Sequence, residues 1–487
     1  MKAKKILLNI CGLIAVMLLT ATTYAQVGIG TITPDPSAML DVQSTTQGLL
    51  APRMTTLERD AITAPAESLL VFDTTEKAFY FYNTASSTWI KLANDASVKR
   101  NNYKLIKSVA DLAQESIDGG ATGYLLDTNT YYEINGTINL IKPINLNNAY
   151  VSGMDASEDV LSSTGVVFKG NSGGSIRNVT LKGTKAFEIT GPGIATNSFL
   201  FVQNTIIDGM NSVGAISGFG LYFANIVQFL NNANGITYSN IGNLLLNNQG
   251  WFANNNGTFE TFSGAFGLIE KVSGFSSVDG ADIALDVSSN PNVSTGILQG
   301  TVFSGTPPAT GYIKGYTIGT YLDFNFNNAW TVGAPGIPRE NDDVATGNLY
   351  YDEANTPNVL TVSNTTPFKL PVNTIATSLF RTAKGTGAGN ENRLIYRGET
   401  RRPINIFAAI SFTTTSGTRF AFSIYKNGSK VTGTEAVVDV TDINRRHSVT
   451  VIGTVNVVKN DYIEIYVRNT NSGSEQILIT SYNLIVN

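Results

Sequence analysis

Short apolar runs recur through the middle of this chain, from Gly123 to Asp323, and they constrain the fold more than any other feature. Each run is followed by Asn, Gly or Ser, and equivalent runs lie roughly 18 to 29 residues apart, a spacing typical of solenoid repeats. No helix of ordinary length fits between them. The pattern therefore predicts a parallel β-solenoid in an all-β chain, with apolar residues facing inward on every rung. Clear examples are Val166-Val167-Phe168, Ile226-Val227, Leu244-Leu245-Leu246 and Ile297-Leu298.

Asparagines recur near the predicted turns of this region, where stacked amides can hydrogen-bond from rung to rung. Ser108-x-x-Asp111 reads as a capping box that opens a short helix, which we expect to cover the open end of the solenoid. The alternative is a β-sandwich with irregular loops, since sandwiches also place strands at short spacing. The asparagines are Asn178, Asn204, Asn231, Asn232, Asn247 and Asn248.

The first 25 residues predict export. Lysines precede an apolar stretch at residues 6–19, and small residues then predict signal-peptide cleavage between Ala25 and Gln26. The only cysteine, Cys11, lies in the segment that would be removed, so the mature chain is expected to form no disulfide and no thiolate metal site. No later stretch approaches about 18 apolar residues, which predicts no transmembrane span after cleavage.

Net charge and histidine content exclude several classes of function. The full chain has 33 basic and 37 acidic residues. Loss of three lysines with the signal segment would leave a net charge of about −7, which argues against nucleic acid as a partner. His447 is the only histidine, so histidine-based triads outside the C-terminal region and His-rich metal sites are excluded. We expect no cofactor and no metal, and a structural role for His447.

Two further units flank the predicted solenoid. In the first, Thr55-x-x-Glu58 predicts a capping box before a short helix, and three short strands follow. Such a small meander is not stable alone, so we expect it to pack against neighbouring chains or the next domain. In the last, long alternating strands and an Asn427-Gly428 hairpin turn predict a jelly-roll-like antiparallel sandwich. The expected divisions are signal peptide 1–25, small α+β module 26–93, capping helix with solenoid 94–335, transition 336–370 and head 371–487.

Several stretches carry a resemblance to known families. VGIGT, PDPSAMLDV, GLLAPRMT and the FYFYN…W ending, within residues 27–92, resemble the N-terminal module of predicted surface and phage tail-fibre-like proteins of the Bacteroidota. The middle region resembles the right-handed parallel β-helices of phage tailspikes. The last region resembles the heads of trimeric fibres and the jelly rolls of the tumour-necrosis-factor-like class. These resemblances imply an extracellular, fibre-like homotrimer, and they imply no particular reaction.

Carboxylates are the catalytic option that the composition leaves open. Glycosidases set an acid and a nucleophile or base roughly 5 to 9.5 Å apart, and acids one rung apart on a solenoid meet that requirement. The candidates are Asp208, Glu260, Asp279 and Asp282, with Glu270 and Asp286 in the same region. Nothing in the sequence selects a pair, and acids in turns are usually solvated.

Aromatic residues are the candidate ligand-binding groups. Tyr222, Trp251 and Trp330 offer flat apolar faces that suit sugar rings. Alternation along the strands predicts that Tyr222 and Trp251 are exposed while Phe223 and Phe252 are buried, although a slip of one residue inverts this order.

Arginines concentrate positive charge early in the predicted head, where they suit either an anionic ligand or acids across a subunit interface. These arginines are Arg381, Arg393, Arg397, Arg401 and Arg402. The loose Gly385-x-Gly387-x-Gly389 loop lacks the Lys-Ser/Thr and the strand–helix context of a phosphate site.

The sequence as a whole predicts an exported, fibre-like cell-surface protein that binds glycan or another surface ligand. The first alternative is a tailspike-like polysaccharide depolymerase, a glycosidase or lyase, that uses solenoid carboxylates. The second alternative is a structural stalk that binds nothing itself. An enzyme requires two facing acids beside an aromatic platform, a binder requires the platform alone, and a stalk requires neither.

Overall fold

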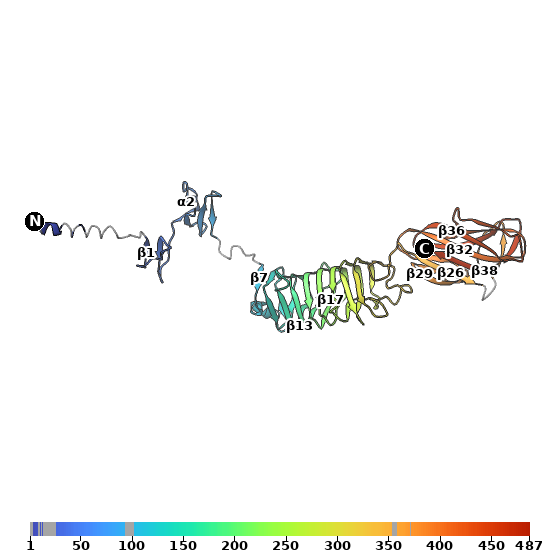
Figure 1. The fold of residues 1–487 in the computed structure, drawn as a ribbon, viewed down its shortest axis with the longest axis horizontal. Coiled ribbons are helices and arrows are strands. Elements are labelled where there is room, and N and C mark those ends of the chain that lie inside the picture. The colour runs from blue at the N-terminus through green and yellow to red at the C-terminus, as the bar shows by residue number, and fades with distance from the viewer. Residues whose placement is uncertain are drawn as a thin grey trace. The chain divides into compact units, whose positions relative to one another are not determined.

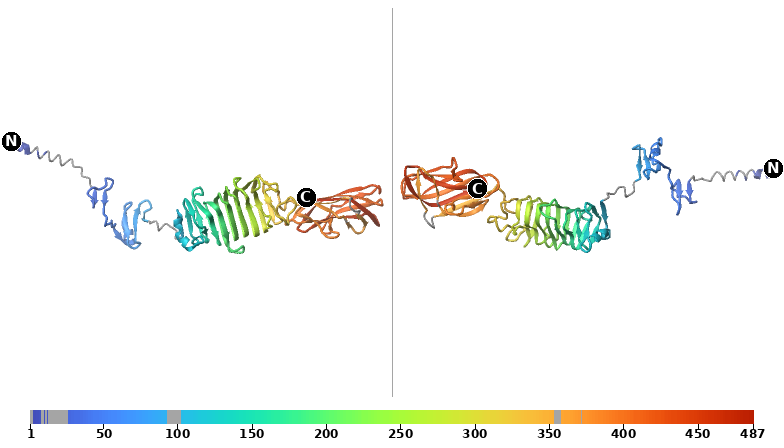
Figure 2. Two further views of the ribbon diagram at one scale, coloured as in Figure 1. Left: turned by 90° about the horizontal axis from the view of Figure 1, so that it is seen from below. Right: turned by 180° about the vertical axis from the view of Figure 1, so that it is seen from behind.

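The computed structural model describes residues 3–7, 10, 12, 26–92, 102–352, 358–370 and 372–487. The chain forms two compact units, Met1–Asn101 and Asn102–Asn487, shown in Figures 1 and 2. Strands make up 53% of the structure and helices are few, so the all-β prediction is confirmed. Ala25 at the predicted cleavage site, Cys11 and residues 93–101 lie outside the described residues.

The first unit contains very little core. Its predicted capping box is present, because Thr55 and Glu58 exchange hydrogen bonds at the start of its helix. Val71 is the one hydrophobic side chain that is fully buried among residues 26–92. The strand pairings are parallel for β1–β2 and β3–β4 and antiparallel for β4–β5 and β5–β6. The elements are β1 (Val27–Ile29), β2 (Leu40–Val42), β3 (Arg53–Met54), α2 (Thr56–Asp60), β4 (Leu70–Asp73), β5 (Ala78–Asn83) and β6 (Thr88–Lys91).

The second unit begins with a parallel β-solenoid of about nine turns, as predicted (Figure 1). Its 19 strands form one continuous sheet. They are β7 (Tyr103–Ile106), β8 (Tyr124–Leu125), β9 (Tyr131–Ile134), β10 (Thr137–Leu140), β11 (Ile144–Asn145), β12 (Tyr150–Ser152), β13 (Val160–Gly170), β14 (Gly174–Arg177), β15 (Thr180–Thr190), β16 (Phe199–Asp208), β17 (Ser212–Leu230), β18 (Ile236–Trp251), β19 (Thr258–Val272), β20 (Phe275–Asp279), β21 (Ile283–Asp286), β22 (Asn292–Gln299), β23 (Val302–Thr306), β24 (Ile313–Lys314) and β25 (Trp330–Gly333).

A short helical segment lies against the first strands of the solenoid. It consists of the 3-10 helix η1 (Val109–Leu112) and α4 (Ala113–Asp118), and the predicted capping box at Ser108 and Asp111 is present. Glu115 is buried there, with its carboxylate 2.7 Å from Nζ of Lys104 and 3.0 Å from the hydroxyl of Tyr132. These contacts attach the helix to β7 and β9.

Asparagine side chains join successive turns, as the sequence predicted. Nδ2 of Asn204 donates to Oδ1 of Asn178 at 3.2 Å, and Nδ2 of Asn254 donates to Oδ1 of Asn231 at 2.8 Å. Asn178, Asn204 and Asn231 also have φ values of 50°, 48° and 55°. Asparagine tolerates this left-handed conformation better than most residues, so one residue type provides both the corner and the cross-turn hydrogen bond.

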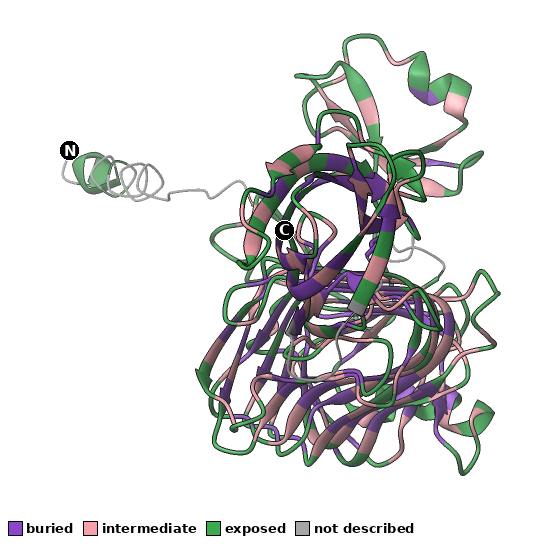
Figure 3. Ribbon diagram, turned by 90° about the vertical axis from the view of Figure 1, so that its right-hand side faces the viewer, coloured by how far each residue is buried: buried purple, intermediate pink, exposed green. Residues whose placement is uncertain are grey.

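The head is a sandwich of two antiparallel sheets that share one core (Figure 3). The first, called here the β32 sheet, has the order β29-β26-β38-β32-β36, with β27 also on β38. The second, the β37 sheet, has the order β30-β31-β37-β33-β34, with β28 on β37 and β35 on β33. The strands are β26 (Thr346–Asp352), β27 (Asn358–Ser363), β28 (Phe368–Lys369), β29 (Ile375–Phe380), β30 (Thr382–Lys384), β31 (Leu394–Tyr396), β32 (Arg402–Thr414), β33 (Arg419–Lys426), β34 (Ser429–Lys430), β35 (Ala436–Asp439), β36 (His447–Val457), β37 (Tyr462–Asn469) and β38 (Ser474–Val486).

Two local predictions about the head have clear outcomes. Asn427 and Gly428 form a two-residue hairpin turn, because Lys426 pairs with Ser429 and both turn residues have positive φ, at 52° and 76°. The assignment of residues 336–370 to a transition was wrong. That segment supplies β26 and β27, which pair with β38, and β28, which pairs with β37, so it belongs to both sheets of the head.

Candidate functional site

Three of the four candidate carboxylates of the solenoid have partners of their own. Oδ2 of Asp208 lies 3.0 Å from Nζ of Lys182, and its Oδ1 accepts from Asn231 at 2.8 Å. Asp282 accepts the backbone N–H of Gly257 at 2.7 Å, and Asp279 is exposed at the end of β20. The fourth candidate, Glu260, is fully buried and shares no partner with the other three.

Glu260 forms an ion pair with Lys271 inside the solenoid. Its two oxygens lie 3.2 and 3.0 Å from Nζ of Lys271, and both side chains are buried. Burial raises the pKa of Glu260, and the neighbouring ammonium of Lys271 opposes that rise. The ammonium also lies 5.0 Å from the ring centroid of Phe259. The pair is enclosed by the interior packing, so in this arrangement Glu260 faces no substrate.

The prediction that Tyr222 and Trp251 are exposed was wrong. Tyr222 is 2% exposed and Trp251 is 0% exposed, and the third candidate, Trp330, is 1% exposed. Trp251 stacks on Phe259 with ring centroids 4.6 Å apart. Nε1 of Trp330 donates to the hydroxyl of Tyr316 at 3.1 Å. All three are therefore core residues, with no face open to a ligand.

The pairing between neighbouring rungs explains why Tyr222 faces the interior and Phe223 faces outward. Tyr222 pairs with Leu200 on one side and Leu244 on the other, and all three side chains are buried. Phe223 instead pairs with Phe201 and Leu245, in a half-buried outer row. A shift of one residue exchanges the inner and outer faces of a strand. Alignment of the segments FLFVQ, LYFAN and NLLLN by their terminal amides, at residues 199–203, 221–225 and 243–247, would have revealed this register.

These three segments form the candidate site, a flat outer surface called here the aromatic–amide face. Neighbouring rungs of such a sheet are about 4.8 Å apart. Phe199 and Phe201 stack with ring centroids 4.7 Å apart, and Phe223 meets Phe201 edge-on at 6.1 Å. The nine side chains are all partly or fully exposed, and none is charged. In rows across β16, β17 and β18, they are Phe199–Leu221–Asn243, Phe201–Phe223–Leu245 and Gln203–Asn225–Asn247.

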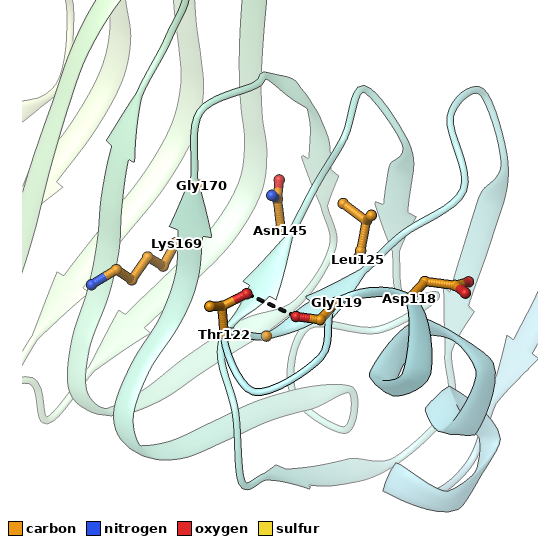
Figure 4. Close-up of a pocket in the computed structure, with 8 residues that line it drawn as sticks. Asp118, Gly119, Thr122, Leu125, Asn145, Lys169 and Gly170 are labelled. Carbon is orange, nitrogen blue, oxygen red and sulfur yellow. Dashed lines mark hydrogen bonds between the residues drawn. The ribbon is translucent and has the colours of Figure 1, made fainter.

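A small polar cleft lies beside α4 (Figure 4). Its volume is about 290 Å³, at the lower end of the range for ligand pockets. Thr122 donates to the carbonyl of Gly119 at 2.7 Å, and Lys169 is paired with Glu188 at 2.6 Å. The hydroxyl of Thr122 and the ammonium of Lys169 are thus already engaged within the chain. The lining includes Asp118, Gly119, Thr122, Leu125, Asn145, Lys169 and Gly170.

A second cleft, of about 420 Å³, lies among the last turns of the solenoid and includes Tyr312, Phe324 and Asn325 in its lining. Phe324 stacks on Phe380 of the head with ring centroids 4.1 Å apart. The carboxylate of Glu340 accepts the backbone N–H groups of Asn325 and Phe326 at 2.7 and 2.9 Å. Burial raises the pKa of Glu340 to about 7, against these hydrogen bonds, which lower it.

Two of the five candidate arginines form ion pairs within the chain. Arg381 is buried, pairs with Asp342 and donates to the carbonyl of Trp330 at 2.7 Å, so it joins the head to the end of the solenoid. Arg393 lies 3.0 Å from Glu464 and 3.6 Å from the ring centroid of Tyr462. The remaining three, Arg397, Arg401 and Arg402, are half-buried or exposed.

Within the part of the chain that the structure describes, no cluster of three or more His, Cys, Asp or Glu side chains is arranged to hold a metal ion. In the same residues, no helix has the length and apolar character needed to cross a bilayer. His447 is half-buried at the start of β36, with its Nε2 2.8 Å from the carbonyl oxygen of Asp442.

Sequence comparison finds one family model that matches part of the chain. Residues 28–107 match the family described as "Phage tail like trimerisation region". This match supports a homotrimer of fibre- or tail-like type. No curated protein matches the chain.

Solved structures give only distant likenesses. The enzymatically active domain of tailspike protein 4 from bacteriophage CBA120 is 9% identical, with 90% of this chain and 77% of that chain covered at a TM-score of 0.19. ORF18 of Geobacillus virus E2 is 9% identical, with 84% and 89% covered at 0.22. Eiger TNF from S. frugiperda is 11% identical, with 30% and 93% covered at 0.22. TM-scores this low do not support any inference about function.

Proposed function

We propose that this chain is an exported, homotrimeric, fibre-like surface protein that binds glycan. The homotrimer is supported by the trimerisation match at residues 28–107 and by the exposed apolar side chains of the first unit. Ile32 is 100% exposed, Leu50 73% and Leu57 84%. Packing against two further copies would remove such side chains from water, which a unit with almost no core of its own requires.

The aromatic–amide face is the surface that supports glycan binding. Phe201 and Phe223 offer flat apolar rings, and Gln203 and Asn247 place amide donors and acceptors in the neighbouring row. Sugar rings have both apolar faces and hydroxyl edges, so this combination matches their chemistry. Because the face is uncharged, we expect it to favour neutral over strongly anionic polysaccharides.

The depolymerase alternative requires two facing acids, and three of its four candidate carboxylates are held by other groups. Asp208 is paired with Lys182, Glu260 with Lys271, and Asp282 with a backbone N–H, and no two of these carboxylates share a partner. The stalk alternative requires a polar surface without a binding platform, whereas Phe199, Phe201 and Phe223 gather on one face.

The test is incubation of residues 26–487 with a panel of bacterial and algal polysaccharides, with binding and new reducing ends both measured. We expect saturable binding without cleavage, and new reducing ends would refute the pure binder. The double variant Phe201→Ser, Phe223→Ser should lose at least tenfold in affinity. Val302→Ser, at an exposed apolar residue of β23 outside the face, is the matched control and should bind normally.

The native mass of the double variant separates two roles for the face. Loss of binding with the trimer intact supports the glycan site. Unchanged binding removes the face from the ligand site. If the double variant loses the trimer, the face is a contact between subunits and the assignment to glycan fails.

A further inference from the structure

The outer surface of the β32 sheet carries apolar side chains in adjacent strands. Phe407 of β32 pairs with Ile452 of β36 on one side and Ile485 of β38 on the other. Their side chains are 45%, 60% and 40% exposed, so one continuous apolar strip runs from β38 across β32 to the edge strand β36.

The surroundings of this strip are uncharged. Two rows of paired residues cross five strands of the sheet, and none of their ten members is acidic or basic. We call these rows the head face. The first row is Thr377–Asn348–Ile485–Phe407–Ile452, and the second is Ile375–Tyr350–Asn483–Ala409–Thr450.

The outer surface of the β37 sheet differs sharply. It carries the ion pairs Arg468–Glu435, at 3.0 Å, and Arg419–Asp439. Charged side chains of this kind keep a sheet surface in water, whereas an uncharged surface with an exposed apolar strip is typical of a contact between proteins. The outer surface of the β37 sheet therefore suits contact with water, whereas that of the β32 sheet suits contact with protein.

We infer that the head face contacts the head of another copy of this chain. This inference rests on the proposed homotrimer, because a trimerisation region holds three heads in one assembly and raises their effective concentration for one another. A second copy also matches the chemistry of the surface. Apolar residues meet apolar residues, while Asn483 and Thr450 supply donors and acceptors beside them, and no charge is left unpaired.

Single-cysteine labelling tests this inference in residues 26–487, which contain no cysteine. Ile452→Cys reports on the head face. Val437→Cys, at a residue that is 51% exposed in β35 of the other sheet, is the matched control. We expect a maleimide reagent to modify the cysteine at position 452 at least tenfold more slowly than the one at 437 in the trimer. Addition of Phe407→Glu should restore fast labelling at position 452, because a charge would break the contact.

The native mass of each cysteine variant shows whether a failure concerns the head contact or the homotrimer itself. Equal labelling rates at the two positions in a trimeric protein would overturn the head contact and leave the proposed homotrimer standing. A monomeric mass would overturn both. Slow labelling at position 452 that Phe407→Glu does not relieve would place the protection inside one subunit and would also overturn the inference.

Discussion

At the scale of single residues, the direction of one side chain decides whether it belongs to the core or to a site. Trp251 lies between Phe229 and Phe259, with ring centroids at 5.9 and 4.6 Å, and none of its surface reaches solvent. The next residue, Phe252, is half-buried and meets Phe275 edge-on at 5.0 Å. A large residue on one side of the strand therefore stabilises the fold, while its neighbour faces outward.

Trp251→Ala should destabilise the protein by about 3–5 kcal/mol, because it leaves a cavity among rings that pack closely. Urea unfolding followed by circular dichroism measures the change. Phe223→Ala, at a half-buried outer position, is the control and should cost clearly less. Wild-type stability of the Trp251 variant would mean that the interior packing described here is wrong.

The ion pair of Glu260 and Lys271 should show strong coupling. Lys271→Met leaves a carboxylate without its partner in the interior, which typically costs about 3–5 kcal/mol. The double variant Glu260→Met, Lys271→Met removes both charges and should recover most of that loss. Denaturant unfolding of the single and double variants checks this, and additive losses would contradict a buried pair.

At the scale of elements, much of the solenoid was predictable because its rules are local. Apolar runs give the strands, asparagines with left-handed backbone give the corners, and the Ser108 capping box gives the helix at the end. One strand alone did not predict which of Tyr222 and Phe223 points into the core. It depends on the partners in the neighbouring rungs, Leu200 and Leu244 for Tyr222, which only an alignment of rungs supplies.

The same limit applied to the candidate site. The sequence predicted aromatic residues beside amides on the solenoid, but strand alternation alone placed Tyr222 and Trp251 outside. β26 and β27 lie in the segment assigned to a transition, because their place in the head depends on long-range pairing with β38. Long-range pairing of this kind leaves no local pattern.

Glu340 should make the end of the solenoid sensitive to pH. Burial raises its pKa from 4.5 to about 7, so the folded state retains a proton that the unfolded state has already lost. The stability from this group is present below about pH 4.5, falls as pH rises, and is lost above about pH 7. The full effect is on the order of 3 kcal/mol.

Thermal unfolding at a series of pH values between 4.5 and 8 measures this dependence. Glu340→Gln stays uncharged and should flatten the decline, whereas Glu399→Gln, at an exposed site, should follow the wild-type profile. Identical profiles for the wild-type protein and the Glu340 variant would show that another group controls stability in this range.

At the scale of the whole molecule, two exposed apolar surfaces among the described residues bear on assembly. One is the first unit, where Ile32, Leu50 and Leu57 are almost wholly exposed around a minimal core. The other is the head face, where Phe407 and Ile452 stand in an uncharged sheet surface. A protein that folds in water covers such surfaces, and the trimerisation match at residues 28–107 supports further copies of the same chain as the cover.

The native mass of purified residues 26–487, measured by light scattering across a dilution series, tests this account most directly. The account predicts three times the mass of one chain, maintained on dilution into the low micromolar range. A stable, well-folded monomer would contradict it, because the bare apolar surfaces of the first unit would then need another explanation.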